Sequence, residues 1–259
     1  MGFSPRGLLA WAKAHATKPM SQQFIDLSHP ISEQTPPFPG DPAVEISVLQ
    51  STAQSDDAPR ELVNSSRVAM CVHCGTHLDA PIHFSERGRS TADIPLEQLV
   101  APAVVIDISA QAAKNRDYLL SAQDVWTFEK QHGRIARGTI VLLKTGWNRY
   151  WPDARTYLGD DTPGDASKLS FPGYGVDAAK QLVEERGVAA LGIDTASIDY
   201  GRSTDFLVHR IAGANNVPGL ENLTNLDQVP SRGATVVALP MKIEGGSGGP
   251  LRAIALVAR

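Results

Sequence analysis

The segment HCGTHLDAPIHF, residues 73–84, constrains the fold of this chain more than any other stretch. It contains three of the seven histidines and an aspartate, separated by even intervals: His73, His77, Asp79 and His83. An α-helix does not fit, because it would turn the aspartate away from the second histidine and would contain Gly75 and Pro81. An extended strand, in contrast, would place all four side chains on one face.

A straight strand would nevertheless spread the outer two histidines over roughly 33 Å, whereas the donors of one ion must lie within about 2.0–2.2 Å of it. We therefore expect the segment to bend, and Gly75 and Pro81 supply the places. Imidazole and carboxylate suit Zn²⁺, Mn²⁺ or Fe²⁺, and the hydroxyl of Thr76 could orient a ligand from behind. The pattern predicts a metal-binding segment rather than histidines gathered by chance.

Cys71 and Cys74 form a C-x-x-C pair, which could alternatively be a structural zinc motif or a redox pair. In an extended segment Cys74 points away from the histidines, and the sequence has no second C-x-x-C to complete a closed site. We interpret both cysteines as small packing residues. Their number and spacing are typical of a reducing compartment.

The charge of the chain excludes several classes of partner. The formal net charge is −4 and the basic residues are scattered, which argues against a nucleic-acid surface. No stretch approaches the ~20 apolar residues of a membrane span, and the run GLLAWA is too short for a signal peptide. We expect a cytoplasmic protein that acts on a small molecule.

Short β-rich runs alternate with helical patterns, which predicts an α/β fold with a mixed sheet. The clearest helices are 121–131, opened by a Ser-x-x-Asp capping pattern, and 176–186, closed by Gly187. Irregular strand spacing and the polar stretch 148–173 argue against a repeated βα barrel. We expect strands at 43–48, 65–72, 103–108, 139–144, 189–193, 235–239 and 253–257.

We assign residues 1–22 to an N-terminal arm and residues 23–259 to one domain. The GGSGG run at 245–249 is predicted to be a flexible turn, because no helix signal or Lys-Ser/Thr follows it as in a phosphate-binding loop. Asp194 and Asp199 follow a predicted buried strand, and we interpret both as turn-forming residues.

The pattern His-x-Gly-Thr-His-x-Asp-x-Pro-x-His-Phe, matched by residues 73–84, resembles the signature of the cyclase family of metal-dependent hydrolases. That family includes bacterial kynurenine formamidase and isatin hydrolase. The blocks DLSHPI, FPGDP, GIDTASID and LPMKIEGGSGGPLRAIAL are also similar to family blocks, in the family order. The resemblance implies a partly barrel-like mixed sheet with flanking helices, and hydrolysis of a C–N amide bond in a formamide or cyclic amide.

The resemblance also implies a set of site residues. His73, His77 and Asp79 would hold one divalent ion, Zn²⁺ or Mn²⁺, and Asp79, His209 and Glu221 a second. Members similar to isatin hydrolase have Gln at the place of Glu221 and one manganese, so the glutamate favours two ions or a more negative single site. His83 would be the catalytic proton donor and acceptor.

Phe38 stands where similar formamidases carry a tryptophan that contacts the aromatic substrate, so we expect it to bind substrate. Family members are commonly homodimers or homotetramers, and we expect the same here. Two alternatives stay open: a metal-dependent lyase or dehydratase acting on a cyclic substrate, and a non-catalytic metal-binding protein. A serine hydrolase is disfavoured, because the chain has no Gly-x-Ser-x-Gly elbow.

Overall fold

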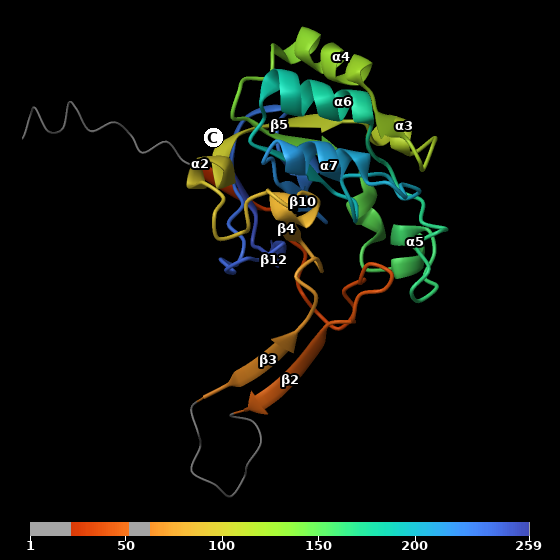
Figure 1. The fold of residues 1–259 in the computed structure, drawn as a ribbon, viewed down its shortest axis with the longest axis vertical. Coiled ribbons are helices and arrows are strands. Elements are labelled where there is room, and N and C mark those ends of the chain that lie inside the picture. The colour runs from red at the N-terminus through yellow and green to blue at the C-terminus, as the bar shows by residue number, and fades with distance from the viewer. Residues whose placement is uncertain (1–21, 52–62, 259) are drawn as a thin grey trace, which may run out of the picture.

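The computed structural model describes residues 22–51 and 63–258 (Figure 1). Its centre is a sheet of nine strands: β1 (Gln22–Asp26), β4 (His77–Asp79), β5 (Val100–Asp107), β7 (Ile140–Lys144), β9 (Ala190–Ile193), β10 (Gly219–Glu221), β11 (Arg232–Val237), β12 (Gly248–Pro250) and β13 (Ile254–Ala258). Their order in the sheet is β1-β13-β11-β5-β7-β9-β10-β4-β12. The four strands from β5 to β10 run parallel to one another and the outer pairs are antiparallel, so the sheet is mixed as predicted.

The sheet curls into half a barrel around one apolar core. Ile25 of β1 and Leu78 of β4 come from strands far apart in the sheet order, yet both belong to the same buried cluster. Val236 of β11 and Leu220 of β10 join them, and all four side chains are at most 3% exposed. Burial of these inward-facing residues is therefore what closes the sheet on itself.

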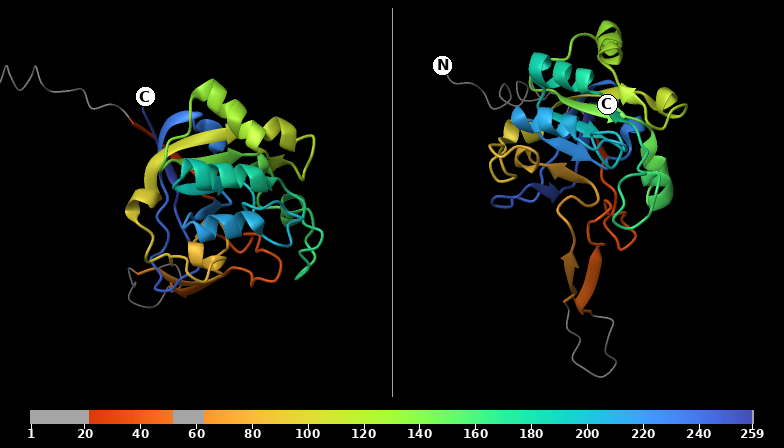
Figure 2. Two further views of the ribbon diagram at one scale, coloured as in Figure 1. Left: turned by 45° about the horizontal axis from the view of Figure 1, so that its top comes forward. Right: turned by 45° about the vertical axis from the view of Figure 1, so that its right-hand side comes forward.

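A layer of helices covers the other face of the sheet (Figures 1 and 2). It consists of α4 (Ala122–His132), α6 (Val176–Lys180), which continues as the π-helical segment η3 (Gln181–Arg186), and α7 (Leu207–Ala214). Apolar residues of the parallel strands, such as Val141, Leu143 and Ile193, pack against these helices. Strands buried on both faces read as continuous apolar runs, which is why the sequence predicted them well.

The remaining elements are short. A two-stranded sheet pairs β6 (Leu119–Leu120) with β8 (Gly173–Tyr174). Single turns of helix form η1 (Pro81–His83), α2 (Leu96–Leu99), α3 (Ser109–Ala112), η2 (Trp147–Tyr150), α5 (Ala154–Leu158) and η4 (Leu226–Gln228). Aromatic residues of η2 and α5 form a third cluster against which Phe38 packs, so the segment 148–173 supports the loop that carries Phe38.

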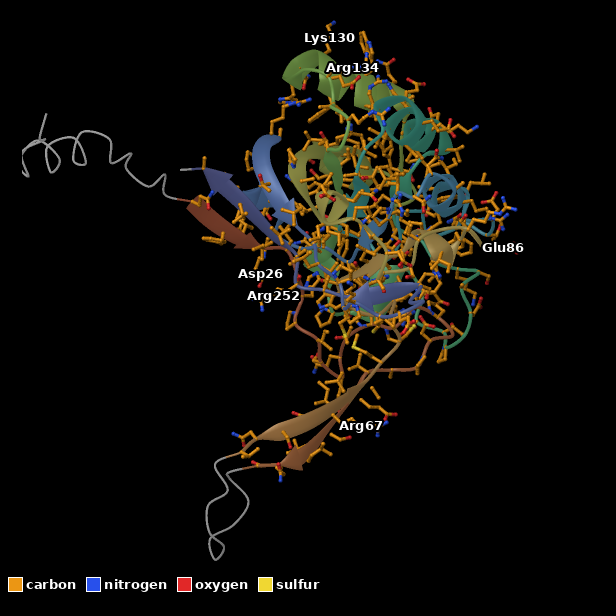
Figure 3. The ribbon with its side chains drawn as sticks, turned by 60° about the vertical axis from the view of Figure 1, so that its left-hand side comes forward. Asp26, Arg67, Glu86, Lys130, Arg134 and Arg252 are labelled. Carbon is orange, nitrogen blue, oxygen red and sulfur yellow. The ribbon has the colours of Figure 1, made fainter. Side chains whose placement is uncertain are left out.

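A hairpin of β2 (Glu45–Gln50) and β3 (Ser65–Ala69) projects from the body as an arm (Figure 1). Figure 3 shows Arg67 on this arm, well away from Asp26 at the end of β1 and Arg252 just before β13, whose side chains form an ion pair at 2.6 Å. The strand expected at 65–72 is thus shorter than predicted, and it lies outside the central sheet because it pairs only with β2.

All seven predicted strands and both predicted helices correspond to elements of the structure, and the Ser121 capping box is present. The prediction of a flexible turn at 245–249 is wrong for its second half. Gly248 and Gly249 form β12, because their backbones pair with Asp79 and Leu78 of β4. The N-terminal arm predicted at residues 1–22 is a different segment from the β2–β3 hairpin. It lies outside the described residues, except that Gln22 already begins β1. Within the described ranges, no helix has the length and apolar character needed to cross a bilayer.

Candidate metal centre

The pairing of β4 with β10 builds the floor of the site. Glu221 stands opposite His77 in the register, and Gly219 stands opposite Asp79. His77 and Asp79 are two residues apart on one strand, so their side chains point to the same face. All three polar side chains are at most 5% exposed. Two segments 130 to 150 residues apart in the sequence therefore place two carboxylates and an imidazole side by side.

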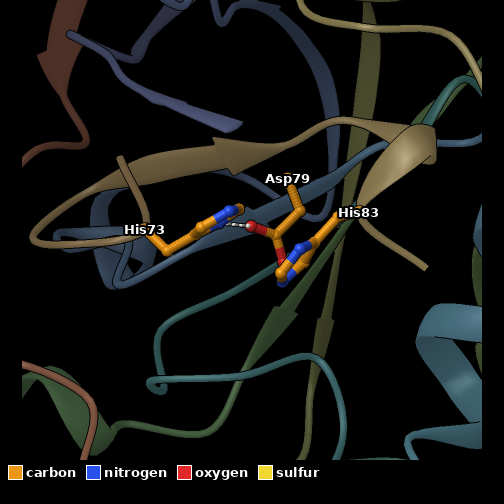
Figure 4. A group of neighbouring side chains, drawn as sticks. All are labelled: His73, Asp79 and His83. Carbon is orange, nitrogen blue, oxygen red and sulfur yellow. Dashed lines mark hydrogen bonds and ion pairs between the residues drawn. The ribbon is translucent and has the colours of Figure 1, made fainter. Parts of the chain in front are cut away.

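The segment bends at both predicted places. Gly75 has φ +68°, a backbone conformation that favours glycine, and η1 starts at Pro81. These bends fold His73 and His83 back over the strand, and their rings stack with centroids 3.9 Å apart. Figure 4 shows both rings converging on the carboxylate of Asp79, and His73 Nδ1 lies 2.6 Å from Asp79 Oδ1.

His209 reaches the same carboxylates from α7. Its Nε2 atom lies 3.0 Å from Asp79 Oδ2 and 3.1 Å from Glu221 Oε1. His77 Nε2 lies 3.1 Å from Asp79 Oδ1 and 3.4 Å from Glu221 Oε2. Asp79 therefore contacts three histidines, His73, His77 and His209, and could be a ligand in common with each of them.

The charges in this cluster shift the pKa values of its members. Burial lowers the pKa of His77, but Asp79 and Glu221 outweigh burial and raise it to about 9. Burial also opposes protonation of His209, yet its carboxylate neighbours hold its pKa well above the ordinary value. Burial raises and the histidines lower the pKa of Asp79, and the histidines prevail. The carboxylates therefore stabilise positive charge in this cluster, carried either by protons on the histidines or by a metal cation.

His83 differs from the other imidazoles. Burial lowers its pKa to about 4, despite the opposing effect of Asp79, and the neighbouring histidines lower it further. It is therefore neutral at pH 7 in this structure, with one ring nitrogen free to accept a proton.

Hydrogen bonds from behind fix the orientation of the histidines. The carbonyl of Gly75 accepts from His77 Nδ1 at 2.9 Å and from the side chain of Asn222 at 2.8 Å. The predicted orienting residue, Thr76, donates its hydroxyl to the carbonyl of Asn222 at 2.7 Å and contacts none of the histidine rings by hydrogen bond. Ser247 Oγ lies 3.0 Å from His73 Nε2. Thr76 therefore supports the backbone of the site rather than a ligand directly.

A cavity of about 240 Å³ opens onto this cluster. Phe38, the residue expected to bind substrate, lines this cavity together with Phe84 and Phe206, so the approach to the polar cluster is aromatic. The polar residues that line the cavity are Asp41, His73, His77, Asp79, His83, Ser197, His209 and Glu221. An aryl ring bound among the phenylalanines would present its substituent to the histidines and carboxylates.

The donor set fits a divalent cation. His77 Nε2 is buried and makes no hydrogen bond to any described residue, although two carboxylate oxygens lie near it. Two groups could each converge ligand atoms lying within 4.8 Å of one another: His77, Asp79 and Glu221, and His73, Asp79 and His83. Mixed imidazole and carboxylate donors are those that Zn²⁺ and Mn²⁺ accept. A buried ring nitrogen that faces carboxylate oxygens without a hydrogen bond is what a metal-ligand position presents.

The structure thus brings together all six residues predicted for metal binding and proton transfer. The interpretation of Asp199 as only a turn-forming residue is wrong, whereas Asp194 does hold a turn. Asp194 holds the turn after β7 through Thr145, Gly146 and Trp147, as expected. Asp199, in contrast, lies 2.7 Å from His209 Nδ1 and belongs to the site. Its position just beyond a buried strand was the available signal, but the same position is equally typical of a turn residue.

The two cysteines are free thiols, and Cys74 is buried. Burial raises the pKa of Cys74 to about 11 and also raises the pKa of Cys71. Both thiols are therefore protonated at neutral pH, which fits packing residues better than metal ligands or nucleophiles.

The chain is similar to several known proteins. Residues 25–200 match the Cyclase family model. An isatin hydrolase of Roseibium aggregatum is 36% identical over 195 residues, which cover 71% of this chain and 72% of that protein. A kynurenine formamidase of Salinibacter ruber is 30% identical over 235 residues, covering 89% and 96% respectively.

Solved structures show the same fold. Isatin hydrolase A from Ralstonia solanacearum superposes with a TM-score of 0.83 at 34% identity, covering 99% of this chain and 98% of that chain. An isatin hydrolase bound to the product analogue thioisatinate gives a TM-score of 0.84 at 29% identity, covering 99% and 100%. The fold of the described residues is therefore similar to that of the isatin hydrolases.

Proposed function

Because this chain belongs to the Cyclase family, we propose that it is a metal-dependent hydrolase that cleaves a C–N amide bond other than a peptide bond. The substrate is a small aromatic molecule with either a cyclic amide, as in isatin, or a formamide, as in N-formylkynurenine. One observation carries the proposal: four imidazoles and two carboxylates converge in an aromatic-lined cavity. Relatives named isatin hydrolase and kynurenine formamidase support it.

The cofactor is a divalent cation, Zn²⁺ or Mn²⁺, with one or two ions per subunit. His73, His77 and Asp79 would hold one ion, and Asp79, His209 and Glu221 the other. When bound, such a cation polarises a carbonyl group and brings the pKa of a coordinated water toward neutrality. The bridging place of Asp79, within hydrogen-bond distance of His73 and His209, supports the two-ion arrangement.

His83 is the catalytic proton carrier in this proposal. Its neutral ring accepts the proton of the attacking water and then delivers it to the amide nitrogen as the C–N bond breaks. Its place in the lining of the cavity, where it is reached by solvent, puts it beside the proposed reacting group, and its stack on His73 fixes the ring plane. A formamide gives formic acid and an amine, whereas a cyclic amide gives one ring-opened molecule that carries both the carboxylic acid and the amine.

The aromatic wall selects the substrate. Phe38 and Phe206 line the cavity with Phe84, whose ring also lies 4.5 Å from that of His209. We propose that these rings pack on the aryl group of the substrate and exclude water from the amide. Phe38 in place of a larger tryptophan leaves more room at the mouth, which favours a compact substrate such as isatin.

The alternatives receive less support. Both named relatives are hydrolases by name, which favours hydrolysis over a lyase or dehydratase reaction. An open cavity beside the donors disfavours a purely structural metal site, in which protein ligands close the coordination sphere.

The direct test is an assay of chelator-treated protein, with Zn²⁺ or Mn²⁺ restored, on isatin and on N-formylkynurenine. We expect hydrolysis of at least one compound after metal is restored and none before. Full activity in the chelated protein, or no turnover of either compound with either metal, would contradict the proposal.

We also propose that the protein is a homodimer or homotetramer. The arm formed by β2 and β3 exposes Ile46, Val48 and Val68, which the strand register places on one face. An isolated two-stranded hairpin is only marginally stable in water, so a second copy of the chain is its proposed cover. Light scattering on Val68→Glu should show a smaller species than the wild type, whereas Ser47→Glu on the opposite face should not.

A further inference from the structure

One side-chain oxygen of Asp199 makes two contacts with His209. Its Oδ2 lies 2.7 Å from His209 Nδ1 and accepts the backbone N–H of the same residue at 3.1 Å. Asp199 is 3% exposed, and each of its two side-chain oxygens accepts a backbone N–H group, Oδ2 from His209 and Oδ1 from Val208. Both oxygens therefore act as hydrogen-bond acceptors toward this segment.

This contact fixes which nitrogen of His209 faces the cluster. Because Asp199 only accepts, the hydrogen of the bond belongs to Nδ1, and Nε2 is the atom directed at Asp79 and Glu221. A rotation of the ring would break the contact with Asp199 and turn Nε2 away from both carboxylates. Ring orientation and tautomer are thus set from outside the cluster.

We propose that Asp199 is a positioning residue that raises the affinity of the metal centre by holding His209 as a ligand through Nε2. The inference rests on the proposed function, because it requires His209 to bind a divalent cation. Carboxylates behind metal-binding imidazoles increase the basicity of the ring and fix its direction, and their loss typically weakens metal binding by about 10–100-fold.

The other oxygen of Asp199 has a separate, structural role. Oδ1 accepts from Ser203 Oγ and from the backbone N–H of Val208, both at 3.2 Å, and so holds the first turn of α7. This second role calls for controls that remove a similar contact without touching the ring of His209.

The chain offers two such controls. Ser203→Ala removes one hydrogen bond to Oδ1 and leaves both contacts of Oδ2. Asp194→Asn changes another buried carboxylate five residues earlier, whose hydrogen bonds go to residues 145–147 and not to the cluster. Both variants test whether a general loosening of this region is enough to weaken metal binding.

The experiment measures the Zn²⁺ dissociation constant of full-length protein by competition with a chromophoric chelator. We expect Asp199→Asn to bind Zn²⁺ about 10–100-fold more weakly than the wild type, and both controls to bind like the wild type. In the zinc-loaded protein, the Nδ1 proton resonance of His209 should move upfield in Asp199→Asn, because a neutral amide accepts more weakly than a carboxylate. A purely structural role would not predict that shift.

Wild-type affinity in Asp199→Asn would overturn the inference, as would equal losses in all three variants or an unchanged His209 resonance. If circular dichroism shows that Asp199→Asn is unfolded, Asp199→Glu is the second variant. It keeps the negative charge but moves the carboxylate, and we expect it to bind Zn²⁺ somewhat more weakly than the wild type. Absence of Zn²⁺ binding by the wild type would instead contradict the proposed function, so the two failures are distinguishable.

Discussion

Gly248 lies directly against the imidazole of His73, so closely that a Cβ atom at Gly248 would be 2.7 Å from His73 Nδ1. Real Cβ atoms do not approach other atoms at that distance, and the opposing atoms belong to a ring that Asp79 and Ser247 already hold. Strand β12 is therefore a wall of the candidate metal centre, and glycine is needed where that wall meets the histidine.

A methyl group at this point should displace His73. We expect Gly248→Ala to lower metal affinity and turnover on the order of 10–100-fold, the size of effect seen when the support of a metal ligand is lost. Calorimetric titration with Zn²⁺ measures the affinity. Gly249→Ala is the control, since its nearest neighbour would be the Met241 carbonyl at 3.2 Å rather than a site residue. Equal metal affinities in both variants would contradict the conclusion that Gly248 packs against His73 as a wall of the metal centre.

A substitution of His83 should distinguish a role in proton transfer from a role in metal binding. We expect His83→Ala to keep the wild-type metal content and to lose about 10²–10⁴ in rate, because general acid–base catalysis contributes that much. Elemental analysis and initial rates measure the two quantities, with His132→Ala, at the end of α4, as a control histidine. The donor atoms of His83, His73 and Asp79 also converge, so loss of one metal equivalent would move His83 into the ligand set.

Glu221 should decide the number of ions. It supplies one oxygen to His209 Nε2 at 3.1 Å and the other to His77 Nε2 at 3.4 Å, so its charge faces both histidines. We expect two ions per subunit in the wild type and one in Glu221→Gln, because a neutral amide satisfies less positive charge. Elemental analysis after dialysis gives the ratio. One ion in both proteins would show a single-metal site.

Fold stability should depend on pH through an ion pair far from the site. Glu129 of α4 accepts two hydrogen bonds from Arg186, at 2.8 and 2.9 Å, and these hydrogen bonds hold the pKa of Glu129 below its ordinary value of 4.5. A lowered folded-state pKa means that the stabilisation is complete above pH 4.5 and is lost as the pH falls through the lower, folded-state value.

We therefore expect Glu129→Gln to reduce the free energy of unfolding by about 1.5–3 kcal/mol at pH 7, the usual value of hydrogen bonds to charged groups. The difference from the wild type should shrink as the solution is acidified below pH 4.5. Urea unfolding at the two pH values measures it. Glu185→Gln, which alters the exposed partner of the same arginine, should have little effect at either pH. A difference that grew in acid would reverse the assigned sign.

The sequence was most informative where burial or spacing left few choices. Strands β7 and β9 are buried on both faces and read as apolar runs, and the even spacing from His73 to His83 required bends that Gly75 and Pro81 provide. The metal-ligand role of His209 came only from the resemblance.

The remaining features depend on contacts between distant segments. Strands β4 and β10 are three residues long, too short to show a periodic pattern, and they exist because they pair with each other. Asp199 could not be assigned to the site because its partner is the side chain of His209, which reaches it only after α7 folds. The glycines at 248 and 249 carry no strand signal and form β12 because β4 offers an open edge.

The proposed metal centre requires one or two divalent cations among His73, His77, Asp79, His209 and Glu221. Anomalous diffraction at the manganese or zinc absorption edge, from crystals grown with that metal, locates such ions without reference to activity. We expect an anomalous peak about 2.0–2.2 Å from Asp79 and from at least two of the other four side chains. Strong peaks only elsewhere in the molecule, with these five side chains hydrogen-bonded to one another, would contradict the proposed site.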